Sequence, residues 1–279
     1  MATDAGRAVS NTRGLDVVLF TSQVLGLEVA VAVAALAEVR TLHLVTTTLP
    51  RPRTLLERVR KTYRYAGPPG LLAAARERLP RPLAAGGPPR LAEEVARRLP
   101  SATHLHFADL HAPECLQRLS ALRPDLGLVF ACYRLRRRLF TIPRLGTINL
   151  HLGKPPEFRG SSPGFYELLQ GIPEVGVTVH RVDEGLDSGP ILLQRTFPLD
   201  LAPPGDPIRY LGALQREVLV PAGASLVAEA VRLEAWGLAS AVPQGSAEGR
   251  PRRRATWAQQ QKLRHVVADR RLTVSGKRS

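Results

Sequence analysis

The opening of the chain contains the pattern that most constrains its fold: two apolar runs typical of strands, separated by a stretch typical of a helix. Leu15–Phe20 predicts a strand, Val24–Ala37 has the length and alanine content of a helix, and Val39–Thr47 is a second β-rich run. Strand, helix and strand in this order form a βαβ unit, which pairs its strands in parallel through a right-handed crossover. We therefore expect an α/β fold built on a mostly parallel sheet.

Further along the chain, strand-like runs recur with helical stretches between them. Strands are expected at Thr103–Phe107, Leu126–Cys132 and Ile148–His151, with a helix over Cys115–Leu122. The run from Leu126 to Cys132 is almost continuously apolar, as a strand covered on both faces requires. We expect this strand near the centre of the sheet.

The length of 279 residues and the 44% hydrophobic content allow one large core, or one core with an appendage. We expect an N-terminal tail over 1–14 and a main domain over 15–200. A basic helical insertion is expected at about 50–100, with a helix at Leu91–Leu99 and a loop at Pro80–Pro89. Residues 201–279 predict a short helical C-terminal appendage over Pro207–Trp236, followed by a basic tail from Gly245 to Ser279.

A formal charge of +15 would attract polyanions such as nucleic acids. The kinds of residue that supply this charge weaken the inference of a nucleic-acid ligand. Lysine occurs only at Lys61, Lys154, Lys262 and Lys277, so nearly all of the positive charge is arginine. A coding bias towards Arg, Ala, Leu, Pro and Gly is an alternative cause of that excess. We do not expect nucleic acid from charge alone, although this class of partner stays open.

The hydrophobic pattern and the cysteine content bear on the cellular location of the protein. The chain has no apolar run of the roughly 18 residues that a membrane span needs, and its first residues are not signal-like. We expect a soluble, cytoplasmic protein with no membrane partner. Its only cysteines, Cys115 and Cys132, have no CxxC partner, so reduced thiols are expected rather than a disulfide framework or a zinc site.

Three polar side chains stand out in this apolar frame. Asn149 and His151 lie in TINLHLGKPPEFRG, where a strand ends, and Asp187 lies in the turn DEGLDSGP. That turn joins Val175–Val182 to Ile191–Pro198, which alternate well enough to pair. In open α/β sheets, ligands bind outside the carboxyl ends of the strands. An amide, an imidazole and a carboxylate can together stabilise the oxyanion formed when an amine attacks a carbonyl and remove the surplus proton, which indicates acyl transfer.

The region from Pro124 to Pro198 also resembles a known family. The segments PDLGLVFACYRL, IPRLGTINLHLGKPPEFRG, FYELLQG and GVTVHRVDEGLDSGPIL resemble the folate-dependent formyltransferases, which include glycinamide ribonucleotide, methionyl-tRNA and amino-sugar enzymes. The resemblance implies a Rossmann-like domain, an enzyme that uses 10-formyltetrahydrofolate as co-substrate, and catalytic roles for Asn149, His151 and Asp187. Alone, each of these residues is more often an ordinary turn or buried polar residue.

The resemblance also implies a cofactor site between the segment after the Leu126–Cys132 strand and the loop before Asp187. The residues expected to line it are Tyr133, Leu135, Val182, Asp183, Glu184 and Gly185. The four arginines nearby either meet the glutamate tail of folate or form a solvated helix end; they are Arg134, Arg136, Arg137 and Arg138. His180 is expected to have a structural or supporting role.

The acceptor is indicated by departures from the family's patterns. The first loop, Thr21–Gln23, lacks the Gly-rich turn of a phosphate binder, and no β-barrel resembling that of the transfer-RNA enzyme is expected after Pro198. The LGKPPEFRG segment replaces the family's serine, leucine, leucine, proline run and introduces Lys154 and Glu157 on the expected acceptor side. We therefore expect a small primary amine, either an amino sugar or an amino-acid-like molecule. The alternatives are an RNA-associated enzyme resembling methionyl-tRNA formyltransferase and a non-catalytic folate-binding module.

A cluster of histidines near the expected strand Thr103–Phe107 suggests a competing hypothesis, a metal site. Alternate histidines on a strand share a face, so His104 and His106 could join Asp109 and His111 around an ion. The spacing matches no strong zinc signature, and a polar strand end explains the same residues. We expect no metal, and the sequence leaves the oligomeric state open.

Overall fold

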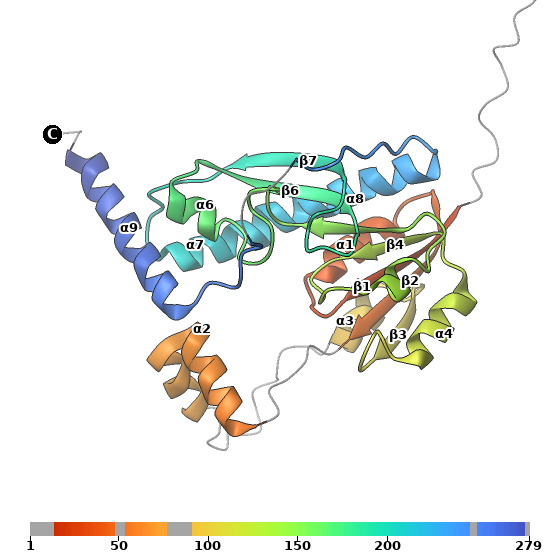
Figure 1. The fold of residues 1–279 in the computed structure, drawn as a ribbon, viewed down its shortest axis with the longest axis horizontal. Helices are drawn as coiled ribbons and strands as arrows, with labels where there is room; N and C mark the ends of the chain where they lie inside the picture. The colour runs from red at the N-terminus through yellow and green to blue at the C-terminus, as the bar shows by residue number, and fades with distance from the viewer. Residues whose placement is uncertain (1–13, 48–53, 77–90, 246–249, 277–279) are drawn as a thin grey trace, which may run out of the picture.

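The computed structural model describes residues 14–47, 54–76, 91–245 and 250–276 (Figure 1). One seven-stranded sheet has the order β3-β2-β1-β4-β5-β6-β7. The strands are β1 (Leu15–Thr21), β2 (Val39–Thr47), β3 (Thr103–Phe107), β4 (Leu126–Val129), β5 (Thr147–His151), β6 (Glu174–Arg181) and β7 (Ile191–Pro198). Strands β1 to β5 pair in parallel, and β6 and β7 add antiparallel pairs at one edge. The predicted α/β fold with a mostly parallel sheet is confirmed.

The βαβ unit at the start of the chain is present, with a shorter helix than expected. Helix α1 (Gly26–Ala34) connects β1 to β2, which pair in parallel. The N–H groups of Gly26 and Leu27 donate to the carbonyls of Gln23 and Val24, three residues back. The chain therefore enters the helix through a tighter turn, which delays the start of α1 relative to Val24.

Strand β4 occupies the middle of the sheet, as expected, and all of its residues are buried. It ends at Val129 rather than at Cys132. Ala131 adopts a left-handed conformation with φ of 52°, and its carbonyl accepts hydrogen bonds from the N–H and hydroxyl of Ser22 at 3.2 and 2.6 Å. These bonds tie the segment after β4 to the loop after β1, where the sequence places the site.

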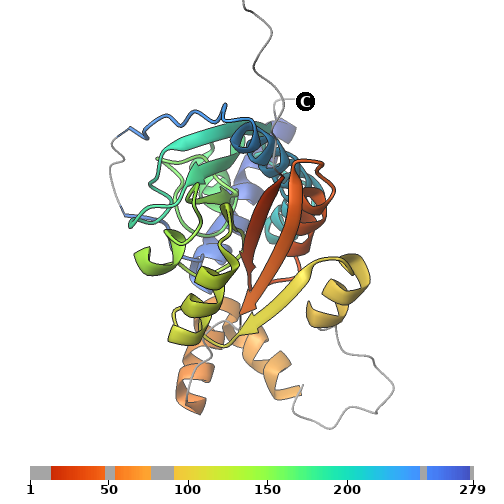
Figure 2. The ribbon, with the colours of Figure 1, turned by 90° about the vertical axis from the view of Figure 1, so that its right-hand side faces the viewer.

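Helices cover both faces of the sheet (Figure 2). Because side chains alternate along β1, Val17 and Leu19 join one core cluster while Val18 and Phe20 join the other. The first cluster includes residues of α1, α3 (Leu91–Arg98) and α8 (Val220–Ala235), and the second includes residues of α4 (Pro113–Leu122) and α5 (Arg137–Phe140).

Helix α8 belongs to the main core rather than to an appendage. It follows α7 (Pro207–Leu214) and the π-helical turn η1 (Gln215–Leu219), and it packs against α1 and β6. Val220, Val227 and Val231 are buried on one side of it. Gly223 allows a close approach to β5, since a Cβ there would lie 2.8 Å from Leu150 Cδ2. The helical character expected after residue 201 is confirmed, but this helix closes one face of the sheet.

The stretch expected as a basic tail contains a helix, α9 (Trp257–Gly276). This helix packs on α6 (Phe165–Gln170) and α7. Leu263 and Val267 are buried with Phe165 and Leu211 in a third cluster. The sequence pattern did not indicate α9, because its polar and apolar residues alternate without a clear helical stripe.

The basic insertion is helical, as expected, and it docks on α9. Helix α2 (Leu55–Arg76) consists of two helical stretches that meet at Gly67, where φ is 62°. The Trp257 ring occupies the space that a Cβ at Gly67 would need, so glycine permits both the bend and the contact. The predicted loop Pro80–Pro89 and almost all of the predicted tail 1–14 lie outside the described residues.

Within the described ranges, none of the helices combines the length and the apolar character that a membrane span requires.

The central position of β4 predicts that truncating the side chain of Leu128, which is only 1% exposed, strongly destabilises the fold. Leu128→Ala should lower the free energy of unfolding by about 2–5 kcal/mol, because the helices on that face cannot fully collapse into the cavity. Urea denaturation measures the change. Leu238→Ala is the matched control, since Leu238 is 65% exposed; an equal loss in the two variants would contradict this account of the core.

Candidate active site

The three polar residues singled out in the sequence converge at the end of β5. Asn149 and His151 are alternate residues of β5, so their side chains leave the same face of the strand. The loop after β6 returns Asp187 to this point, where its carboxylate lies 3.4 Å from Asn149 Nδ2 and 3.5 Å from His151 Nδ1. The structure therefore brings Asn149, His151 and Asp187 together.

His180 is a fourth member of this group. Antiparallel pairing places it directly opposite Asn149, with 3.1 Å between His180 Nε2 and Asn149 Nδ2. His180 Nε2 also lies 3.6 Å from Asp187 Oδ1, and Nδ1 lies 2.7 Å from the carbonyl of Arg181. Nδ1–H can donate to the Arg181 carbonyl, while Nε2 faces both the Asn149 amide and the Asp187 carboxylate. The contact between His180 and Asn149 follows from the pairing register of β5 and β6.

His151 is buried, and both of its ring nitrogens face hydrogen-bond acceptors. Nε2 lies 2.8 Å from the carbonyl oxygen of Phe158, and Nδ1 lies 3.5 Å from Asp187 Oδ2. Gly153 makes this packing possible, because a Cβ there would collide with His151 Nε2.

Asp187 is held by donors from several elements. Its side chain is 11% exposed, and its Oδ2 accepts the backbone N–H of Gly160 at 2.8 Å. Burial raises the pKa of Asp187, but hydrogen bonding to His180, the charges of His151 and His180, and the Gly160 N–H together outweigh it. The pKa of Asp187 therefore lies below its ordinary value, and the carboxylate is ionised at neutral pH.

A first cleft, which we call the Val182 cleft, opens on one side of this group. It encloses about 460 Å³. Its lining includes five of the six residues expected at the cofactor site, namely Tyr133, Leu135, Val182, Asp183 and Gly185.

Glu184, the sixth residue expected at the cofactor site, does not line the Val182 cleft. Its carboxylate pairs with Arg137 at 3.2 Å, and its carbonyl accepts from Arg134. The carboxylate of Asp183 makes hydrogen bonds within its own loop, where it accepts from the Gly185 N–H at 3.0 Å and the Ser188 hydroxyl at 2.8 Å. Asp183 therefore shapes the wall of the cleft and is not a free side-chain acceptor.

A second cleft, the Ser161 cleft, opens on the other side of the polar group and encloses about 890 Å³. Polar side chains on its walls are Gln23, Ser161, Ser162 and Gln215. The two clefts share Cys132, Asn149, Leu186 and Asp187 in their linings. Burial raises the pKa of the Cys132 thiol to about 12, so this sulfur stays protonated and is a poor nucleophile.

Lys154 and Glu157, which are expected near the acceptor side, line neither of these two clefts. Lys154 Nζ pairs instead with Glu174 at the start of β6. The absence of a side chain at Gly176 lets Lys154 lie against β6, since a Cβ there would be 2.7 Å from Lys154 Cβ.

The four arginines after β4 differ in their surroundings. Arg134 lines the Val182 cleft. Arg137 is engaged with Glu184, and the backbone N–H of Arg136 donates to His111 Nε2 at 3.0 Å. Arg138, the second residue of α5, is exposed.

The histidines at the end of β3 are engaged with protein groups. His104 Nε2 and His106 Nδ1 lie 2.8 and 3.0 Å from the hydroxyl of Thr46, and His111 lies 3.5 Å from Asp109. Within the described part of the chain, no group of His, Cys, Asp and Glu has the arrangement that could hold a metal ion.

Comparison with known proteins places this site in context. Residues 78–203 match the family model described as formyl transferase. A methionyl-tRNA formyltransferase from Roseiflexus sp. (strain RS-1) is 40% identical over 139 residues, which are 50% of this chain and 41% of the relative. A second, from Legionella pneumophila (strain Corby), is 44% identical over 87 residues, which are 31% of this chain and 28% of the relative. The chain thus matches well under half the length of these curated relatives.

Solved structures share the fold. Glycinamide ribonucleotide transformylase 1 from Symbiobacterium toebii has a TM-score of 0.55 at 22% identity, covering 84% of this chain and 93% of that chain. A 4-N formyltransferase from Francisella tularensis has a TM-score of 0.54 at 14% identity, covering 86% of this chain and 76% of that chain. The same arrangement of sheet and helices therefore occurs in proteins of low sequence identity.

Sequence analysis did not identify Glu167, a buried carboxyl group of α6 beside the site. It is 2% exposed, and it lines a small cavity together with His151, Gly160 and Arg252. Burial raises the pKa of Glu167 to about 7, against the opposing effects of two backbone N–H groups and the charge of Arg252. An acidic residue in an otherwise apolar helical run was the only signal in the sequence.

The raised pKa of Glu167 predicts a pH-dependent stability. The native state binds this proton more tightly than the unfolded chain, so stability falls as pH rises from the ordinary pKa of 4.5 to about 7. The loss is about 3 kcal/mol, at 1.36 kcal/mol per unit. Glu167→Gln should remove this dependence, so urea denaturation at pH 5 and pH 8 should show the variant gaining relative to the parent. Parallel pH profiles would contradict the assignment.

Proposed function

We propose that this chain is a folate-dependent formyltransferase, which moves a formyl group from 10-formyltetrahydrofolate to the primary amine of a small molecule. One observation carries the proposal: the Val182 cleft and the Ser161 cleft meet at Asn149 and Asp187. A group-transfer enzyme needs two adjoining spaces, one for donor and one for acceptor, with polar groups where they join.

The Val182 cleft suits the folate donor. Val129, Leu135 and Val182 supply apolar walls for a flat ring, and Arg134 supplies a cation for the carboxylates of its tail. Gly185 leaves bare backbone on the cleft wall, because a Cβ there would collide with Ser188. When bound, the donor supplies an activated formyl group attached to its N10 nitrogen.

The acceptor amine enters from the Ser161 cleft. Its nitrogen lone pair forms a bond to the formyl carbon while the carbonyl π electrons move to oxygen. The surplus proton on the amine passes to Asp187, directly or through a water. When the electrons return from oxygen, the bond from the formyl carbon to N10 breaks and this proton passes from Asp187 to N10, which leaves the carboxylate ionised again.

Asn149 and His151 are placed to stabilise the negative oxygen. Both donate to protein acceptors in this structure, Asn149 towards Asp187 and His151 to the carbonyl of Phe158. One N–H of each group must turn from its present partner towards the oxygen as charge develops, since a donor stabilises an oxyanion only at hydrogen-bond distance.

The walls of the Ser161 cleft favour an amino sugar or an amino-acid-like amine. Gln23, Ser161, Ser162 and Gln215 offer amide and hydroxyl groups that match hydroxyls or amides of such an acceptor. The hydroxyls of the first loop are already engaged, Thr21 with the Gln23 carbonyl at 3.2 Å and Ser22 with the Ala131 carbonyl at 2.6 Å. They offer little to a phosphate group.

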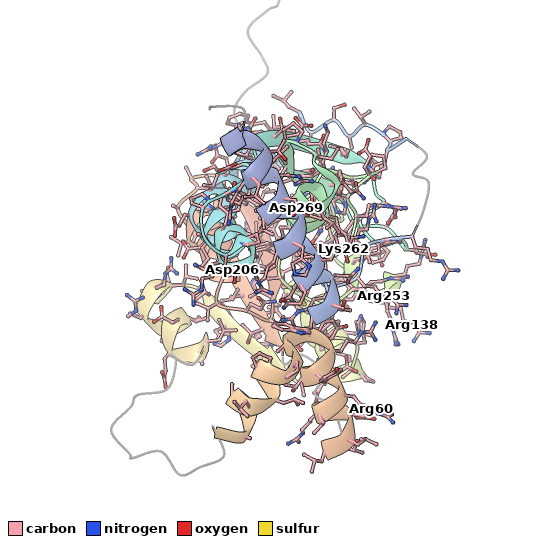
Figure 3. All side chains as sticks on the ribbon, turned by 90° about the vertical axis from the view of Figure 1, so that its left-hand side faces the viewer. Arg60, Arg138, Asp206, Arg253, Lys262 and Asp269 are labelled. Carbon is pink, nitrogen blue, oxygen red and sulfur yellow. The ribbon has the colours of Figure 1, made fainter. Side chains whose placement is uncertain are left out.

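A second candidate acceptor is an aminoacyl-tRNA. The Ser161 cleft continues into a groove that reaches Arg254 and Gln260, and Gln260 Nε2 donates to the Tyr65 carbonyl of α2 at 3.0 Å. The first stretch of α2 exposes four cations: Arg58, Arg60, Lys61 and Arg64. Figure 3 shows this side, with Arg60 on α2 and Lys262 on α9 labelled. The 40% identity to a methionyl-tRNA formyltransferase adds support.

The proposed reaction predicts that the polar group is required for activity. Asn149→Ala, His151→Ala and Asp187→Asn should each lower the rate of formyl transfer by about 10²-fold or more, since each removes an oxyanion donor or the proton acceptor. Mass spectrometry measures the gain of one formyl unit on a panel of amino sugars, nucleotide-linked amino sugars and amino-acid-like amines. His265→Ala, an exposed histidine of α9, is the control. Undiminished activity in all three variants would refute the assignment, and folate binding without any formylated amine would favour a non-catalytic module.

The tRNA alternative predicts salt-sensitive binding through α2. The double variant Arg60→Glu and Arg64→Glu should bind initiator methionyl-tRNA about tenfold more weakly or worse at about 50 mM salt, with a shallower salt dependence. Filter binding measures both quantities. The exposed Arg97 and Arg118 provide a control pair with the same change of charge. Equal affinities in the two double variants, or no binding by the parent, would exclude this acceptor.

A further inference from the structure

Asp187 occupies a conformation that the surrounding structure has to maintain. Its φ is 52°, in the left-handed region that costs a non-glycine residue of this kind about 1 kcal/mol or more. Its carboxylate must also stay within reach of groups on β5, β6 and the loop of residues 152–163. Residues 182–188 form a loop rather than a strand, so the sheet pairing alone does not hold it.

The chain after α8 holds the backbone on either side of this turn. Val242 and Ile191 form an antiparallel bridge in which each N–H donates to the other's carbonyl at 2.8 Å. Two residues later, Gln244 Nε2 donates to the carbonyl of Asp187 at 3.0 Å and to that of Gly189 at 2.7 Å. One side-chain amide thus bonds to the catalytic candidate itself and to the residue two positions beyond it.

A second part of the same segment fixes the position of Gly160, whose N–H donates to the Asp187 carboxylate. Arg252 bridges Gly160: its N–H donates to the Arg159 carbonyl at 2.8 Å, and its carbonyl accepts the Ser161 N–H at 2.9 Å. Gly160 has φ of 102°, and a Cβ there would collide with the Arg252 carbonyl. The Arg252 guanidinium lies over the Tyr166 ring, 5.1 Å from its centroid. This bridge aims the Gly160 N–H at Asp187 Oδ2.

We propose that the C-terminal segment, residues 241–245 and 250–256, positions the Asp187 carboxylate, and that Gln244 is a positioning residue for it. The proposal rests on the function proposed above only in taking Asp187 as the proton acceptor. Both contacts come from outside the matched residues 78–203, so the formyl transferase domain of this chain is completed by a segment that follows it.

Removing the Gln244 amide should let the turn relax and carry the carboxylate away from its donors. Those donors are the Gly160 N–H, His151 on β5 and His180 on β6, which together hold the pKa of Asp187 down against burial. The pKa of Asp187 should therefore rise in Gln244→Ala. The value of kcat should fall about tenfold or more, because proton transfer depends on position, while KM for the acceptor should change little.

The test compares Gln244→Ala and Gln244→Met with the parent. Methionine keeps roughly the size of the side chain, has no N–H donor and adds no charge, so both variants should behave alike, and the second covers the case in which alanine prevents folding. Val242→Ala is the matched control, because its side chain is 66% exposed and its bridge uses only backbone groups. Carbon-13 NMR of aspartate-labelled protein follows the Cγ of Asp187, assigned by its absence in Asp187→Asn.

We expect the Asp187 titration to move to higher pH in both Gln244 variants and to stay in place in Val242→Ala, with kcat lowered in the first two only. An unchanged Asp187 titration in a folded Gln244 variant would overturn the proposal. A shifted titration in a protein that formylates no amine would uphold the positioning role and refute the proposed reaction, so the two failures are distinct.

Discussion

The register of β6 against β5 is the constraint on which the site depends. Because His180 pairs opposite Asn149 and β6 ends one residue later, the loop of residues 182–188 passes over the end of β5. That path brings Asp187 within 3.5 Å of His151 and lays Val182 along one cleft. A slip by one residue would turn alternate side chains to the opposite face and separate His180 from Asn149. Strand pairing therefore determines the chemistry as well as the stability of this edge.

Two buried carboxyl groups near this edge respond to burial in opposite ways. Asp187 has a charged or hydrogen-bonding partner on every side, and its pKa is lowered despite the cost of desolvation. Glu167 has backbone donors and the charge of Arg252, but desolvation dominates and raises its pKa. The difference lies in the number and placement of donors, since both side chains are largely removed from solvent. At neutral pH Asp187 is therefore ionised, while Glu167, with a pKa of about 7, is only partly so.

Much of the fold was predictable because strands and helices record their burial in short-range patterns. The apolar run after Leu126 marked the central strand, and alternation marked the β6–β7 pair. Helix α9 was missed because it packs on α6 and α7 through few buried residues and carries no strong apolar stripe. The position of the Lys154 side chain was not predictable, because it depends on the space above Gly176, a residue of β6 that is distant in the sequence. Such contacts leave no local trace in the chain.

The sequence by itself determined the α/β sheet, the polar residues Asn149, His151 and Asp187, and the resemblance to the folate-dependent formyltransferases that these residues carry. These follow from periodicity and from motifs, which are properties of neighbouring residues. Only the tertiary structure decided that His180 joins the group, that two clefts meet at Asn149 and Asp187, and that Gln244 and Arg252 reach back to the loops around the carboxylate. Each of these is a contact between segments far apart in the chain, and its partner is selected by packing geometry rather than by residue type.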